Sequence, residues 1–167
     1  MMKGPVVSNT TPLNYLVLIG VIDVLEKMYG VVNIAEEVAV ELRRARAPQI
    51  VRKWIADPPV WLRIHKVGAE ADGSLAVLDA GERETIVLAE HLEARVIVID
   101  DWAGRKAAER RGMACVGTLG LLAEAARLGL VEFSDTIDNL KTTSFRWSAD
   151  VVDELLREDA MRRAGKL

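Results

Sequence analysis

Short β-branched runs alternate with longer helical segments along most of the chain, and this alternation constrains the fold more than any other feature. Three runs, 5–8, 31–34 and 95–99, are rich in valine and isoleucine and lack polar alternation. Such strands are typical of a parallel sheet that is buried on both faces. Residues 61–67 alternate and predict a half-buried strand, and 113–116 a short one. The sequence therefore predicts an α/β fold with a central parallel sheet and helices on both faces.

Helical segments separate these runs, and glycine or proline marks several of their ends. Thr11 directly precedes Pro12, which predicts an N-cap followed by proline at the first helical position. We expect helices at 13–19, 21–29, 36–44, 49–56, 81–92, 102–111, 119–128 and 149–163. Residues 68–74 resemble a loop. This order predicts a single domain over 1–131 and a C-terminal helical extension over 132–167.

Composition excludes several classes of protein. Half of the residues are apolar and 28% are charged, which suits a chain with a packed core. The formal net charge of −3 argues against purely electrostatic nucleic-acid binding, although a local basic patch stays open. The one cysteine, Cys115, excludes an internal disulfide and a thiolate zinc site. No apolar stretch approaches the ~20 residues of a membrane span, so we expect a cytoplasmic protein without a membrane partner.

Polar residues follow the predicted strands at the edge where open parallel sheets place their functional sites. Asn9 and Thr10 follow the first strand, Asp100 and Asp101 follow the strand at 95–99, and Thr118 follows a later one. Two adjacent carboxylates after a buried strand are costly unless a cation compensates them. The alternative interpretation is that one aspartate simply caps the next helix.

Three glutamates are further candidates. Glu82 and Glu84 lie two positions apart on one helix and therefore point about 200° away from each other. Glu82 lies beside the apolar stripe and should face the sheet edge, whereas Glu84 should face solvent or support the site. Glu41 lies late on its helix, where the helix dipole disfavours a carboxylate. The alternative for Glu82 and Glu84 is that the dipole favours acids at a helix N-terminus.

Several carboxylates at one sheet edge, without a cysteine or histidine cluster, would form an oxygen-rich site suited to Mg²⁺ or Mn²⁺. His65 and His91 lack ligand spacing. Two basic clusters flank the acidic residues and would suit a phosphate backbone, or they form solvated helix faces. The clusters are Arg43, Arg44, Arg46, Arg52 and Lys53, and Arg105, Lys106, Arg110 and Arg111.

Four segments together resemble the PIN-domain family, and more narrowly its VapC-related prokaryotic subgroup of nucleases. The resemblance is carried by residues 6–13 (VVSNTTPL), 78–84 (LDAGERE), 98–101 (VIDD) and 117–120 (GTLG). It implies a parallel sheet between helices and Mg²⁺- or Mn²⁺-dependent endoribonuclease activity, often as the toxin of a toxin–antitoxin pair. An RNA substrate, a protein antitoxin and a homodimer are the implied partners.

The resemblance also implies roles for individual residues. Glu41, Glu82 and Asp100 match the second, third and fourth acidic positions of the family. At the first position the family usually has aspartate, and this chain has Asn9. We therefore expect Asn9, Glu41, Glu82 and Asp100 to be catalytic, with Glu41, Glu82, Asp100 and Asp101 as metal ligands. Glu84 is a further acid common in the subgroup, and the expected substrate contacts are Thr10, Thr118 and Arg105.

Asn9 leaves two functions open. An amide oxygen can ligate a hard cation but brings no charge, so metal binding and catalysis would be weaker than with aspartate. The first hypothesis is a working ribonuclease. The second is a catalytically impaired module that binds RNA or a protein partner without cleavage. A receiver-like phosphotransfer domain is a distant third, because it requires an acidic pair after the first strand and a lysine after a later one.

Overall fold

β1 (Val6–Ser8) lies in the middle of a five-stranded sheet in the computed structural model, which describes residues 4–68 and 73–165. The strand order is β3-β2-β1-β4-β5, and every neighbouring pair is parallel. Val7 of β1 lies opposite Asn33 of β2 and Ile97 of β4. The other strands are β2 (Val32–Ala35), β3 (Leu62–His65), β4 (Val96–Val98) and β5 (Cys115–Val116). The expected parallel α/β fold is confirmed.

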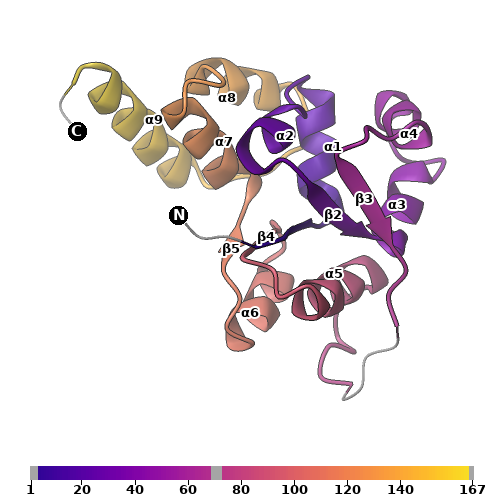
Figure 1. Cartoon of the computed structure of the whole chain (residues 1–167). Coiled ribbons are helices and arrows are strands. Elements are labelled where there is room, and N and C mark those ends of the chain that lie inside the picture. Colours follow the sequence, from indigo (N-terminus) through magenta and orange to yellow (C-terminus); the bar gives the residue numbers. More distant parts are fainter. Residues whose placement is uncertain (1–3, 69–72, 166–167) are drawn as a thin grey trace.

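Helices cover both faces of the sheet. Figure 1 shows α5 and α6 below the sheet and α1, α2 and α7 above it, with α3 and α4 beside β3. The helices are α1 (Thr10–Leu18), α2 (Val24–Tyr29), α3 (Glu36–Arg43), α4 (Gln49–Ala56), α5 (Ala80–His91), α6 (Trp102–Arg110), α7 (Thr118–Arg127), α8 (Phe133–Lys141) and α9 (Ala149–Arg163).

The core lies between the sheet and the two helical layers. Val7, Ile97 and Val98 on the central strands have no exposed surface, which explains why these runs show no polar alternation. β3 and β5 are the two edge strands, and the central residues of β3, Arg63 and Ile64, are both exposed. The alternating run therefore marked one of the edge strands, although Ile64 is exposed like Arg63 and does not alternate with it.

The first helix begins earlier than expected. α1 begins at Thr10 with Asn9 as N-cap, so Pro12 is its third residue and the expected proline at the first position is wrong. Proline is tolerated there because the first N–H groups of a helix have no partner within the helix. The second helix is also shorter than expected, since residues 21–23 form a turn before α2. Gly30 ends α2 with a positive φ of 75°.

α8 was not expected. Phe133, Ile137 and Leu140 recur at helical spacing and are all buried, so a helical signal was present in the sequence. α9 has the predicted bounds, and α8 and α9 both pack on α7. The boundary between 131 and 132 stays a prediction. Of the expected loop 68–74, residues 69–72 lie outside the described residues.

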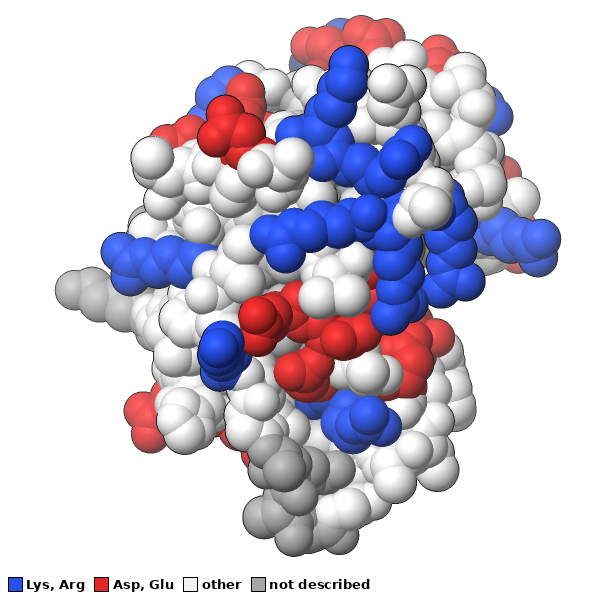
Figure 2. Space-filling model, turned by 90° about the vertical axis from the view of Figure 1, so that its right-hand side faces the viewer, with Lys and Arg blue, Asp and Glu red and all other residues white. Residues whose placement is uncertain are grey.

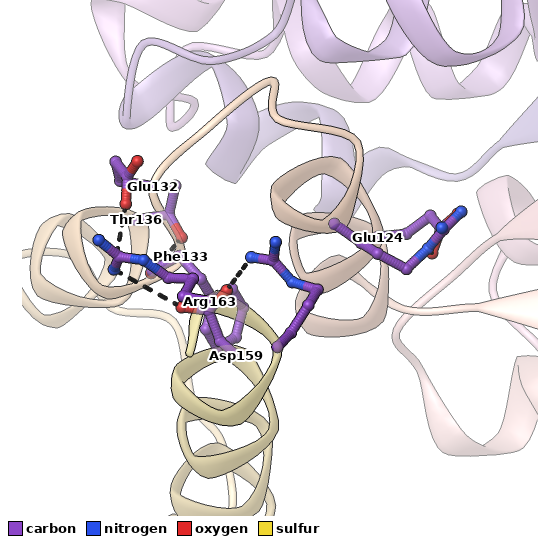
Figure 3. A network of polar contacts seen from close by, with 8 residues as sticks. Glu124, Glu132, Phe133, Thr136, Asp159 and Arg163 are labelled. Atoms are coloured by element: carbon purple, nitrogen blue, oxygen red, sulfur yellow. Dashed lines mark hydrogen bonds and ion pairs between the residues drawn. The ribbon is translucent and has the colours of Figure 1, made fainter. Parts of the chain in front are cut away.

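One ion pair joins α9 to the start of α8, and another lies within α9 (Figure 3). Arg163 pairs with Glu132, the N-cap of α8, at 3.3 Å, and Arg162 pairs with Asp159 at 2.6 Å. Pairs of this kind contribute little stability when exposed, so α9 depends mainly on its apolar contacts. None of the helices in the described part of the chain is long and apolar enough to cross a membrane.

Candidate active site

Asp100 lies two residues after the last residue of β4 and is fixed by Thr118 at the start of α7. The Thr118 backbone N–H donates to Oδ1 at 2.8 Å, and its hydroxyl donates to Oδ2 at 2.6 Å. Burial raises the pKa of Asp100, and the bonds from Thr118 and the charge of Arg105 oppose that shift without cancelling it. Thr118 has no exposed surface, so its side chain reaches the site through Asp100.

Asp101 is the helix cap and Asp100 is not. The Asp101 side chain is the N-cap of α6 and accepts a hydrogen bond from the Gly104 N–H at 2.8 Å. One aspartate of the pair therefore has the structural role that the alternative interpretation assigned to it. Both carboxylate oxygens of Asp100 bind Thr118, so helix capping does not explain why a second carboxylate lies here.

Glu82 takes part in a capping box at the start of α5. Its backbone N–H donates to Asp79 Oδ1 at 2.9 Å, and the Asp79 N–H donates to Glu82 Oε2 at 3.3 Å. Burial, followed by repulsion from Asp79 and Asp101, raises the pKa of Glu82 to about 7. Sequence reasoning did not assign a role to Asp79, although the Asp-x-x-Glu spacing was a signal for this cap.

Glu41 lies on α3 and approaches the N-terminus of α5. The Thr10 hydroxyl donates to its carboxylate. The backbone of Gly81 packs so closely against this carboxylate that a Cβ on Gly81 would lie 2.8 Å from Cδ of Glu41. Burial raises the pKa of Glu41, Thr10 opposes this rise, and repulsion from Asp79 adds to it.

Asn9 occupies the end of β1 and is almost completely buried, with 4% of its surface exposed. Its backbone N–H donates to the Val98 carbonyl at 2.9 Å, which ties α1 to the end of β4. Its side-chain Oδ1 accepts a hydrogen bond from the Thr85 hydroxyl at 3.3 Å. Thr85 was not found from the sequence, because nothing local indicates that a residue on α5 meets one 76 positions earlier.

Most of the predicted site residues line two neighbouring clefts, whereas the buried Asn9 and Thr118 line neither. The first, of about 790 Å³, contains Glu82, Asp100, Asp101 and Arg105, and we refer to it as the β4 cleft. The second, of about 590 Å³, we refer to as the α3 cleft, and it contains Thr10, Glu41, Asp79 and Arg44. Thr11, Tyr15 and Ser144 line both clefts, so the clefts adjoin.

Acidic side chains form the middle of one face of the molecule, and Lys and Arg side chains run along one border of it (Figure 2). Glu84 lies near other acids, because burial raises its pKa and repulsion from Glu37 and Glu36 adds to the rise. One residue of the predicted basic clusters is neutralised, since Arg44 pairs with Glu37 at 3.0 Å. The basic clusters could thus bind a phosphate backbone or form solvated helix faces, and the structure is consistent with each interpretation.

The oxygen ligands of the β4 cleft are of the kind that a hard dication prefers, although the carboxylates are not clustered around one point. Among residues 4–68 and 73–165, no three acidic, histidine or cysteine side chains lie close enough together to hold one ion. The β4 cleft nevertheless offers three carboxylates and no softer donor except the thiol of Cys115. The backbone of Gly117 is closely approached by Asp100 and Arg105, since a Cβ there would lie 2.8 Å from Asp100 Oδ1 and 3.0 Å from Arg105 Nη1. The residues present therefore fit Mg²⁺ or Mn²⁺ in kind.

A family model described as a PIN domain matches residues 5–160, which includes all the strands and nearly all of α9. No curated protein matches the chain.

Proposed function

The chain belongs to the PIN-domain family, and from this membership we propose that it is a metal-dependent endoribonuclease, acting as the toxin of a toxin–antitoxin pair. Family membership supports a nuclease in general. The observation that carries the finer proposal is the β4 cleft, where Glu82, Asp100 and Asp101 face one space beside Arg105. An acidic centre with an adjacent cation suits a phosphodiester whose charge must be neutralised from two sides.

One or two of the carboxylates of Asp100, Asp101 and Glu82 would ligate the ion in the β4 cleft, with water completing its shell, because no three of the described acids lie close enough to hold it together. Glu41, in the adjoining α3 cleft, and the almost completely buried Asn9 would act on the ion from neighbouring elements. When bound, Mg²⁺ or Mn²⁺ would stabilise charge on the phosphodiester and increase the acidity of water. Asn9 brings no charge, so the site has one carboxylate fewer than the family pattern. We expect a correspondingly weaker affinity for the ion.

The chain's own residues supply orientation and a cation for the phosphate. Thr118 fixes both oxygens of Asp100, which preorganises that carboxylate toward the cleft. In the ion-free protein Glu82 has a pKa of about 7 and holds a proton near neutral pH, which it would have to release before it could ligate the ion. The guanidinium of Arg105 would bind a phosphate oxygen at the same wall of the cleft.

Cleavage of a mixed single-stranded RNA with Mg²⁺ or Mn²⁺ tests the proposal on the native protein, Asn9→Asp and Asp100→Asn. We expect the native protein to cleave, Asp100→Asn to lose activity, and Asn9→Asp to need less metal. Full activity of Asp100→Asn would contradict the assigned centre. As a toxin, the native protein should also arrest bacterial growth when expressed, and Asp100→Asn should not.

A second function is favoured by one observation, the buried amide of Asn9 and its bond from Thr85. The neutral amide in place of a carboxylate would suit a PIN-like module that binds RNA or a protein partner without cleaving. RNA binding without turnover at saturating Mn²⁺, together with cleavage by Asn9→Asp alone, would support it. The antitoxin, a homodimer and a cytoplasmic location belong to the first proposal, and co-purification and sedimentation would test the two partners.

A further inference from the structure

The β4 cleft continues past its acidic residues to a wall that the nuclease proposal does not use. This wall is formed by the segment between α8 and α9 and by the start of α9, and it includes Phe145, Arg146, Val151 and Leu155. One cleft therefore has an acidic end and an aromatic, apolar end. A ligand that occupies its whole length must present both charge and apolar surface.

The aromatic wall is held in place by contacts with α1. The Tyr15 hydroxyl hydrogen-bonds Ser144 Oγ at 2.8 Å, and the Tyr15 ring meets Phe145 edge to face, with centroids 4.9 Å apart. The Trp147 ring also contacts Phe145, at a tilt of 34° and with centroids 5.9 Å apart. The Phe145 N–H also donates to Thr143 Oγ1 at 3.2 Å. Phe145 is therefore fixed at the wall before any ligand binds.

Two arginines line the same cleft as this wall. Arg105 lies at the acidic end and acts electrostatically on Asp100, whereas Arg146 is exposed and makes no ion pair with any residue that the structure describes. Arg146 is therefore available to an anionic ligand. An aromatic ring and guanidinium groups lining one cleft are the combination by which proteins bind single-stranded nucleic acid.

We propose that the aromatic end of the β4 cleft is a subsite for one unpaired nucleobase, which stacks on Phe145 while Arg105 and Arg146 bind the flanking phosphates. The choice of nucleic acid as ligand rests on the proposed function. Stacking on a side chain requires a base whose face is free, so the subsite selects single-stranded over duplex RNA. The C-terminal segment would thus deliver the strand to the acidic end of the same cleft.

RNA binding by the full-length Asp100→Asn protein in EDTA tests the subsite without cleavage. The probes are a fluorescently labelled single-stranded RNA of mixed sequence and the same strand in a duplex, followed by anisotropy. Phe145→Leu keeps an apolar side chain but removes the ring, and it should weaken single-strand binding about tenfold, as expected for loss of one stacked base. Duplex binding should be weaker from the start and insensitive to this change.

Arg146→Gln tests the phosphate contact, with Arg157→Gln as the matched control. Arg157 is exposed on α9 and does not line the cleft, and its substitution changes the net charge equally. For a single strand, removing one cation that binds a phosphate should reduce the slope of log affinity against log salt by about 0.7. We expect that reduction for Arg146→Gln and none for Arg157→Gln. Thermal unfolding by circular dichroism verifies that each variant is folded.

Three results would overturn the proposal: no binding of the single strand, equal binding of strand and duplex, or unchanged binding by folded Phe145→Leu. The last would leave the wall to another occupant, such as a polypeptide partner. Different results would contradict the subsite and the nuclease proposal. Cleavage whose KM is unaffected by Phe145→Leu would retain the nuclease alone, whereas Phe145-dependent binding without any cleavage would retain the subsite alone.

Discussion

Thr118 binds both carboxylate oxygens of Asp100, one through its backbone N–H and the other through its hydroxyl. The two bonds, at 2.8 Å and 2.6 Å, join the end of β4 to the first residue of α7. They compensate a mostly buried carboxylate that would otherwise lose its hydration without replacement. Thr118 thereby determines both the orientation of Asp100 and how readily Asp100 ionises.

We expect Thr118→Val to raise the pKa of Asp100 further, because the hydroxyl bond is the first of the contacts that lower it. The loss of a hydrogen bond to a buried charged group should also cost about 1–3 kcal/mol in the free energy of unfolding. Urea unfolding and a carboxyl-detected NMR titration measure the two effects. Thr118→Ser keeps the hydroxyl and should leave the pKa near that of the native protein. An unchanged Asp100 pKa in Thr118→Val would contradict this account.

Asp79→Asn should lower the pKa of Glu82 from its value of about 7, because Asp79 is the main charge that repels it. Asparagine can cap α5 as aspartate does, so the helix start should be preserved. Glu82 binds its proton more tightly when folded, so its contribution to stability falls as pH rises from about 4.5 to about 7. We expect that fall to be smaller in Asp79→Asn.

Unfolding followed at pH 5 and pH 8 measures this difference. Asp79→Ala is the informative comparison, since it removes the cap as well as the charge and should be about 1 kcal/mol less stable than Asp79→Asn at both pH values. If Asp79→Asn retained the full pH dependence of the native protein, repulsion from Asp79 would not be a source of the raised pKa.

Gly117→Ala should destabilise the fold and disturb the site together. A Cβ at this position would lie 2.8 Å from Asp100 Oδ1 and 3.0 Å from Arg105 Nη1, so one or both side chains must shift. Overpacking of this kind costs about 1–3 kcal/mol. Gly68→Ala is the control, because a Cβ there would meet none of the described residues within 4 Å. Chemical denaturation of the two variants measures the difference, and equal stabilities would refute the close approach at Gly117.

The sequence predicted the strands and most helices because their signals are local. The continuous apolar runs indicated buried central strands, and the amphipathic pattern with Ser148 before it gave the bounds of α9. α8 was missed although its apolar spacing was present, because no cap or glycine marks its start. The start of α1 was displaced because Pro12 suggested a boundary that the first turn of a helix does not require.

The site was less predictable because it depends on contacts distant in the sequence. The position of Asp100 after a buried strand was enough to select it as a candidate. Which aspartate would cap α6, and that Thr85 would meet Asn9, depends on packing between elements. The division of the acids between two clefts follows from how α3 and α5 face each other, which no residue spacing encodes.

Val152→Ala tests whether the C-terminal extension unfolds together with the sheet. Val152 is the buried residue of α9, with 3% of its surface exposed, whereas its neighbour Val151 is 47% exposed. Two methyl groups removed from a buried site should cost about 1.5 kcal/mol, and Val151→Ala should cost much less. If residues 5–160 form one cooperative unit, as the extent of the family match suggests, Val152→Ala shifts the single unfolding transition of the whole chain. A separate early transition, seen by far-UV circular dichroism while the core stays folded, would instead show that α9 unfolds independently and that the extension is a distinct unit.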